Sequence, residues 1–154
     1  MTVSPTRILG IDTSLRCTGL GIIDSDGSTL QIVQFGVIRN KPGLSVTECV
    51  GRIYSGISQI IAEEQPDVVA IEGVFYCKNV RTAVTLGEAR GAVLAALSTA
   101  ELVVHEYAPR RVKQAVAGYG AADKEQVRKM VISMLGIEST PPYDASDALA
   151  IAIC

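Results

Sequence analysis

Four acidic residues stand where the sequence pattern predicts that carboxylates come together. Asp12 follows the apolar run ILGI, and Glu72 follows the apolar run VVAI. Sites in α/β sheets gather where strands end. Asp144 and Asp147 are three residues apart, so they share one face if the last segment is a helix. Because burying an unpaired charge is costly, we expect the four side chains to converge on something that compensates them.

The chemistry expected of this set is metal binding through oxygen. Carboxylates without His or Cys suit Mg²⁺, for which Mn²⁺ can substitute. With two such ions, one activates a water and the other stabilises the leaving oxygen, which hydrolyses a phosphodiester without a protein nucleophile. Taken singly, two of the residues have simpler interpretations: Asp144 as an N-cap, and Asp147 as a first-turn acid favoured by the helix dipole.

The hydrophobic pattern predicts the elements that must position these side chains. Three strands, at 8–11, 19–23 and 29–38, are joined by short turns and predict an antiparallel meander. Ser45 with Glu48 is a capping box that predicts a helix to about Glu64. This order predicts one α/β domain over 1–154, with a mixed five-stranded sheet and helices on both faces. The remaining strands are expected at 68–71 and 102–107, and the remaining helices at 79–99, 110–117, 124–135 and from 144 onward.

Composition narrows the classes of protein that remain. Hydrophobic residues make up 48% of the 154, which is ample for a packed core. The segment 73–134 holds nine of the 14 basic residues and five of the 16 acidic ones, so a local positive surface is expected despite a net charge of −2. The four cysteines have no zinc-site spacing and are expected to be free thiols. Without a signal-peptide pattern or a membrane-length apolar stretch, a cytoplasmic protein is expected.

One helix carries a stripe of small side chains. Gly87, Gly91 and Ala95 recur every four residues within 79–99. From the residues alone, close packing on the sheet is the favoured interpretation, and a helix–helix contact between subunits is the alternative.

Several motifs, in order and spacing, resemble those of the RuvC-type Holliday junction endonucleases, members of the RNase H-like superfamily. Each motif alone is a weak signal, whereas the series spans nearly the whole chain. The motifs are LGID at 9–12 with TGLG at 18–21, IEGVF at 71–75 followed by Lys78-Asn79, LGEARG at 86–91, EYAPRRVKQAVAGYGAADKEQV at 106–127 and DASDALAIAI at 144–153.

The resemblance implies a role for each matching position. Asp12, Glu72, Asp144 and Asp147 match the metal-binding carboxylates of the family. Phe75 matches an aromatic that stacks on an unpaired base, with core packing as the alternative. Lys113 and Lys124 match lysines close to the scissile phosphate, with ordinary solvated lysines as the alternative. Further candidates for DNA-backbone contacts in the positive segment are Lys78, Arg81, Arg90, Arg110 and Arg111.

The resemblance also implies partners. The family acts on four-way junction DNA as a homodimer, with two Mg²⁺ ions per site, beside a branch-migration motor. Under this resemblance the stripe of small residues serves the dimer interface as well as packing. Two positions depart from the family pattern: Thr13-Ser14 replaces Pro-Gly, and Gly73 replaces a polar residue.

Three other functions are compatible with parts of the pattern. An RNase H-like nuclease acting on another substrate, such as an RNA/DNA hybrid, would share the carboxylates. An actin-like ATPase or sugar kinase uses a similar strand–turn–strand but needs two such domains and further nucleotide motifs. A DNA-binding module without catalysis would not retain four carboxylates that repel phosphate.

Overall fold

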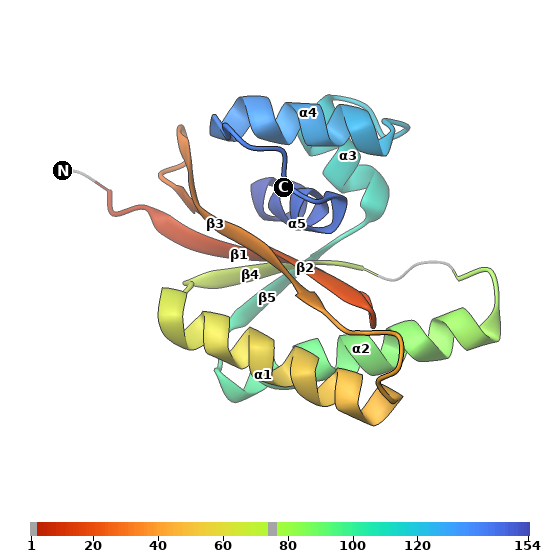
Figure 1. The fold of residues 1–154 in the computed structure, drawn as a ribbon. Coiled ribbons are helices and arrows are strands. Elements are labelled where there is room, and N and C mark those ends of the chain that lie inside the picture. Colours follow the sequence, from red (N-terminus) through yellow and green to blue (C-terminus); the bar gives the residue numbers. More distant parts are fainter. Residues whose placement is uncertain (1–2, 74–76) are drawn as a thin grey trace.

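The computed structural model describes residues 3–73 and 77–154 of the chain. A central sheet lies between two layers of helices (Figure 1). The strands are β1 (Thr6–Asp12), β2 (Cys17–Ser25), β3 (Leu30–Arg39), β4 (Val68–Glu72) and β5 (Val103–Tyr107). The helices are α1 (Val46–Glu64), α2 (Val80–Thr99), α3 (Pro109–Ala117), α4 (Lys124–Leu135) and α5 (Tyr143–Ile153).

The strand order is β3-β2-β1-β4-β5. The first three strands form the antiparallel meander, while β4 pairs parallel with β1 and β5 pairs parallel with β4. The predicted mixed five-stranded sheet is therefore confirmed. A short apolar strand with helical crossovers on either side leads naturally to the parallel pairs, because parallel strands need such crossovers.

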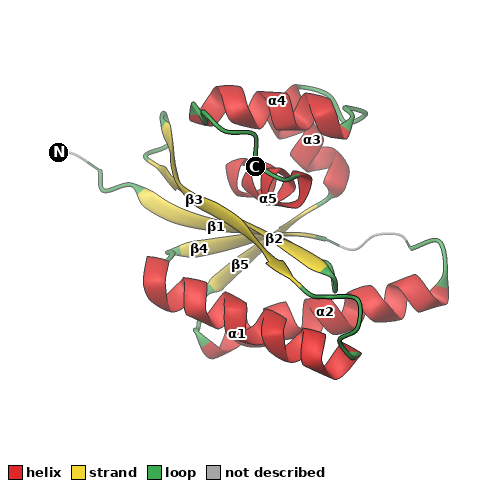
Figure 2. Cartoon of the chain, viewed as in Figure 1, coloured by secondary structure: helices red, strands yellow, loops and turns green. Residues whose placement is uncertain are grey.

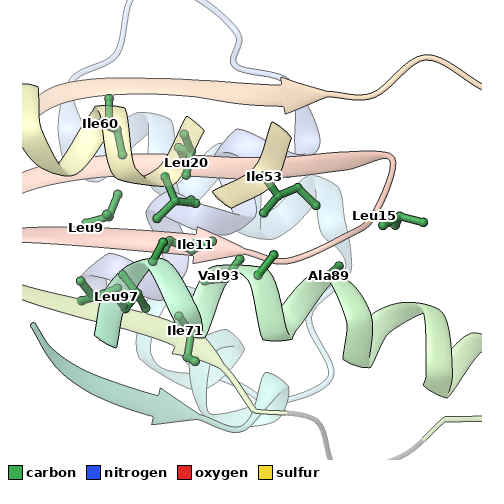
Figure 3. Close-up of a cluster of buried hydrophobic side chains, with 14 of the residues drawn as sticks. Leu9, Ile11, Leu15, Leu20, Ile53, Ile60, Ile71, Ala89, Val93 and Leu97 are labelled. Carbon is green, nitrogen blue, oxygen red and sulfur yellow. The ribbon is translucent and has the colours of Figure 1, made fainter. Parts of the chain in front are cut away.

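Each face of the sheet has its own core. Helices α1 and α2 cover one face, and α3, α4 and α5 cover the other (Figure 2). Leu9 and Ile11 of β1 point to the first core and meet Ile53 of α1 and Val93 of α2 (Figure 3). The second core gathers Ile23 with the buried faces of the other three helices. Because neighbouring strand residues point to opposite faces, the near-continuous apolar runs serve both cores. None of the described helices has the length and apolarity needed to cross a membrane.

Two glycines allow α5 to lie directly on the sheet. A Cβ at Gly10 would collide with the Ala148 carbonyl oxygen, and one at Gly19 with the Asp144 carbonyl oxygen. Both obstacles are backbone of α5, which cannot move aside as a side chain can. The missing side chains therefore set how closely α5 approaches β1 along its later turns and β2 at its first turn.

The capping box at Ser45 is confirmed, since both of its reciprocal hydrogen bonds are present. The last helix begins one residue before the expected start, with Pro142 as its N-cap and Asp144 in the first turn. Interpreting Asp144 as an N-cap is therefore wrong.

The stripe of small residues on α2 is exposed. A Cβ at Gly87 or Gly91 would have no neighbour within 4 Å, and Ala95 is also exposed. Packing of this stripe on the sheet is therefore wrong. The buried face of α2 is the adjacent one, made of Ala89, Ala92, Val93, Ala96 and Leu97.

Candidate active site

A cleft of about 280 Å³ opens where β1, β4 and α5 meet. Three of the predicted carboxylates line it: Asp12, Glu72 and Asp147. Both predicted lysines, Lys113 of α3 and Lys124 of α4, line it as well. Residues more than 130 positions apart in the sequence are thus brought to one place, with both signs of charge facing the same space.

The register of the sheet explains how the carboxylates meet. Ile11 and Ile71 are paired on adjacent parallel strands, so the next residues, Asp12 and Glu72, end their strands side by side. On the other side, Asp12 is paired with Gly19 of β2. Because α5 rests on Gly19, the start of that helix lies over Asp12 and supplies Asp147.

Asp144 lies beside this cleft, one turn before Asp147, and does not line it. Its negative charge contributes to raising the pKa of both Asp12 and Asp147. It also approaches the thiol of Cys17, whose pKa is raised to about 11 by burial and by this carboxylate. The sequence reasoning placed no function on Cys17, and its position at the start of β2 carried no signal for this contact.

The electrostatics of the cleft favour a cation. Burial, followed by the charges of Asp147, Glu72 and Asp144, raises the pKa of Asp12 to about 8. Burial also raises the pKa of Glu72 and of Asp147, against the opposing effect of both lysines. The raised pKa values mean that the ionised carboxylates are unfavourable when they lie together in this cleft. A bound divalent cation would stabilise their ionised forms.

The donor set fits a hard cation, because each nearby acidic ligand is a carboxylate oxygen. Among the residues that the structure describes, however, no three His, Cys, Asp or Glu side chains are arranged to hold one ion. The carboxylates are therefore gathered around the cleft without forming a closed ligand shell.

The two lysines come from different helices, one from the start of α4 and the other from the middle of α3. Lys124 is the first residue of α4, directly after the N-cap Asp123, whose capping box with Gln126 is complete. Lys113 lies in α3, which begins with Pro109 at its first turn. The apolar neighbours Val112 and Val127 also line the cleft and hold the two helices against the core.

Arg90 has an internal role that the sequence did not indicate. Its Nη1 donates to the Glu72 carbonyl oxygen at 2.8 Å, and its Nη2 lies 2.7 Å from Glu106 Oε1. Its guanidinium therefore braces the ends of β4 and β5 and fixes the backbone of a cleft carboxylate. The structure thus gives Arg90 a role within the fold, and its predicted contact with DNA stays a prediction.

The other predicted contacts are dispersed. Arg110 packs alongside Gly120, where a Cβ would contact its side chain. Burial raises the pKa of the Cys154 thiol, and the nearby Arg111 opposes this with a smaller lowering effect. Lys78 is exposed just before α2, and Arg81 lines a second cleft described below. Phe75 lies outside the described residues.

Comparison with known proteins identifies the family. The family model described as crossover junction endodeoxyribonuclease RuvC matches residues 8–154. This chain belongs to the RuvC family. The RuvC protein of Chloroflexus aggregans is 48% identical over 149 residues, covering 96% of this chain and 91% of that protein. The RuvC protein of Halorhodospira halophila is 50% identical over 149 residues, covering 97% of this chain and 89% of that protein.

Solved structures agree with the family. Thermus thermophilus RuvC in complex with a Holliday junction substrate matches with a TM-score of 0.90 and 36% identity, covering 96% of this chain and 91% of that one. The yeast mitochondrial Holliday junction resolvase matches with a TM-score of 0.66 at 15% identity, which shows a shared fold. The predicted resemblance to RuvC-type endonucleases is confirmed.

Proposed function

We propose that this RuvC-family chain is an endonuclease that resolves four-way DNA junctions by hydrolysing phosphodiesters. The observation that carries the proposal is the cleft in which Asp12, Glu72 and Asp147 face Lys113 and Lys124. Carboxylates that bind cations beside lysines that attract phosphate are the parts that phosphodiester hydrolysis needs. The complex of Thermus thermophilus RuvC with a Holliday junction supports the choice of substrate.

The four carboxylates are proposed to hold Mg²⁺, with two ions per site and Mn²⁺ as a substitute. Asp12, Glu72 and Asp147 would be ligands within the cleft, and Asp144 would join them from its edge. When bound, the metal ions supply an activated water and stabilise the leaving oxygen. Burial of Asp12 and the raised pKa values of the cleft carboxylates support this assignment, because a cation would stabilise the ionised forms.

The lysines would act on the phosphate. Their charges lower the pKa of Glu72 and Asp147 and so favour the ionised carboxylates at neutral pH. Toward substrate, the ammonium groups would hold the scissile phosphate and offset the negative charge that grows on its oxygens during attack. Their positions in two different helices allow the groups to approach the phosphate from separate directions.

The proposed active form is a homodimer that contacts through α2. The exposed stripe of Gly87, Gly91 and Ala95 lies beside Leu94 and Val84, which are 36% and 53% exposed. Small residues let two helices approach closely, and the flanking apolar side chains gain from burial. A two-fold dimer would place two sites on opposite strands of a four-way junction, which itself has two-fold symmetry. A cytoplasmic location and a branch-migration motor as partner complete the proposal.

Cleavage of labelled substrates tests the function. A four-way junction, a matched duplex and an RNA/DNA hybrid are incubated with the protein, with and without Mg²⁺. We expect symmetric, ligatable nicks in the junction only, dependent on Mg²⁺ and abolished by Asp12→Asn. Equal cutting of junction and duplex, or preferential cutting of the hybrid, would contradict junction resolution and favour another RNase H-like nuclease.

A further inference from the structure

A second cleft lies on the other side of the loop that follows Asp12. It has a volume of about 390 Å³ and is formed by the β1–β2 loop on one side and the first turns of α2 on the other. None of its lining residues is acidic, in contrast to the carboxylate cleft. The lining residues are Thr13, Ser14, Leu15, Arg16, Arg81, Thr82, Thr85 and Leu86.

The loop wall of this cleft is held rigidly by buried bonds. Asn40 is 3% exposed, and its side-chain Nδ2 donates to the Leu15 carbonyl oxygen at 2.8 Å. The backbone N–H of Asn40 donates to the Arg16 carbonyl oxygen at 2.9 Å. The fully buried hydroxyl of Thr18 donates to the Ser14 carbonyl oxygen. Figure 3 shows Leu15 at the turn that joins β1 to β2. The loop is therefore in place before any ligand arrives, so little ordering is needed on binding.

The two arginines of the cleft differ in whether their guanidinium groups already bind other described parts of the protein. Arg16 Nη1 donates to the carbonyl oxygens of Lys41 at 2.9 Å and Leu44 at 3.1 Å, which fixes that guanidinium against the loop before α1. Arg81 is exposed, and none of the hydrogen bonds or ion pairs among the described residues involves its side chain. Four hydroxyl-bearing residues, Thr13, Ser14, Thr82 and Thr85, line the same space.

We propose that this cleft binds a non-scissile phosphodiester of the junction, next to the cleavage site. Arg81 supplies the charge, and the hydroxyls of Thr13 and Thr85 supply neutral donors to phosphate oxygens. The cleft adjoins the active site through the Asp12–Thr13 peptide bond, so a DNA backbone held here would be fixed relative to the carboxylates. This inference rests on the proposed function, and it assigns the Thr13-Ser14 departure from the family pattern to DNA binding.

The salt dependence of DNA binding distinguishes a charged phosphate contact from a merely structural role, because only the contact changes it when removed. Binding of a four-way junction is measured over a range of salt concentrations with Asp12→Asn as the parent, so that DNA is bound and not cut. Arg81→Gln is expected to weaken binding roughly tenfold and to reduce the slope of log K against log[salt] by about 0.9, the value for one lost phosphate contact. Thr13→Val with Thr85→Val is expected to weaken binding roughly three- to tenfold with an unchanged slope, because hydroxyls carry no charge.

Two controls make the result specific. Lys129→Gln removes an exposed charge from α4, away from both clefts, and is expected to leave affinity and slope near those of the parent. Arg81→Lys retains the charge and is expected to retain the slope. Neutral methylphosphonates placed at single positions should weaken binding of the parent at one non-scissile phosphate, and Arg81→Gln should be insensitive there.

The outcomes separate this proposal from the proposed function. If the parent binds junction and duplex equally, junction recognition itself has failed. If the parent prefers the junction but Arg81→Gln behaves as Lys129→Gln does, the second cleft does not bind phosphate. Sensitivity of Arg81→Gln to the same methylphosphonate as the parent would also overturn it.

Discussion

Replacing Gly19 by alanine should separate the placement of α5 from the chemistry of its carboxylates. The new Cβ would collide with the carbonyl group of Asp144 and lie 3.0 Å from the amide nitrogen of Ala145. These obstacles are backbone atoms, so α5 as a whole must move away from β2. The movement would carry Asp144 and Asp147 away from Asp12, although no proposed ligand has been changed.

The expected magnitudes follow from overpacking and misalignment. Inserting a methyl group into a closely packed region typically costs about 1–3 kcal/mol. For a chain of this length, each kcal/mol lowers Tm by roughly 2–4 °C, so a decrease of roughly 2–12 °C is expected. Misplacement of catalytic groups by about 1 Å can cost roughly a hundredfold in rate. Cleavage of the junction should therefore fall by about that factor while the protein remains folded.

The assays are thermal unfolding and single-turnover cleavage at saturating protein, with circular dichroism to confirm that the fold is retained. Gly36→Ala is the matched control, because Gly36 lies in neighbouring β3 and its Cβ would meet nothing within 4 Å. It should change Tm and rate little. A Gly19→Ala protein with the Tm and cleavage rate of the wild type would refute the argument that this glycine positions the active site.

Three further perturbations probe the network around the cleft. Arg90→Met should destabilise the chain by about 1–3 kcal/mol in urea unfolding, because the carbonyl of Glu72 loses its charged donor; an unchanged midpoint would contradict the bracing role. Because the pKa of Asp12 is raised to about 8, metal-free stability should fall as pH rises from about 4 to 8. Asp12→Asn should flatten this profile and raise Tm at pH 8 in EDTA, and a lower Tm would refute the argument that burial and like-charge repulsion disfavour the ionised Asp12. Asn40→Ala should lower the free energy of unfolding by about 1–3 kcal/mol, because the buried carbonyl of Leu15 loses its hydrogen-bond donor. Equilibrium unfolding of Asn40→Ala and Asn40→Asp checks whether the side-chain amide donor is responsible.

Local patterns predicted the secondary structure well because their causes are local. The capping box at Ser45, the cap at Asp123 and the glycine after Leu135 define helix ends through contacts within a few residues. The alternation and apolarity of the strands likewise depend on near neighbours. One local error, Asp144 as an N-cap, arose because Pro142 begins the helix without a side-chain cap.

Contacts between distant segments could not be predicted from local sequence patterns in the same way. Arg90 was predicted to contact DNA because it lies in the positive segment of the sequence. In the structure its side chain bonds to the end of β4 and to Glu106 on β5. The stripe at Gly87 and Gly91 had the spacing of a packed helix face, yet α2 is rotated so that Ala92 and Val93 face the core instead. Helical periodicity defines which residues share a face, whereas neighbouring elements decide which face is covered.

The sequence alone predicted the order of the elements along the chain and the family, and it singled out five residues that line the cleft: Asp12, Glu72, Asp147, Lys113 and Lys124. Those features follow from residue type, short-range periodicity and motif order. Only the tertiary structure decided that Asp12 and Glu72 end adjacent parallel strands, that Gly10 and Gly19 admit α5 to the sheet, and that Thr13 and Arg81 line a second cleft. The physical reason is that register and close approach depend on the packing of whole elements, in which residues far apart in the chain compete for the same space.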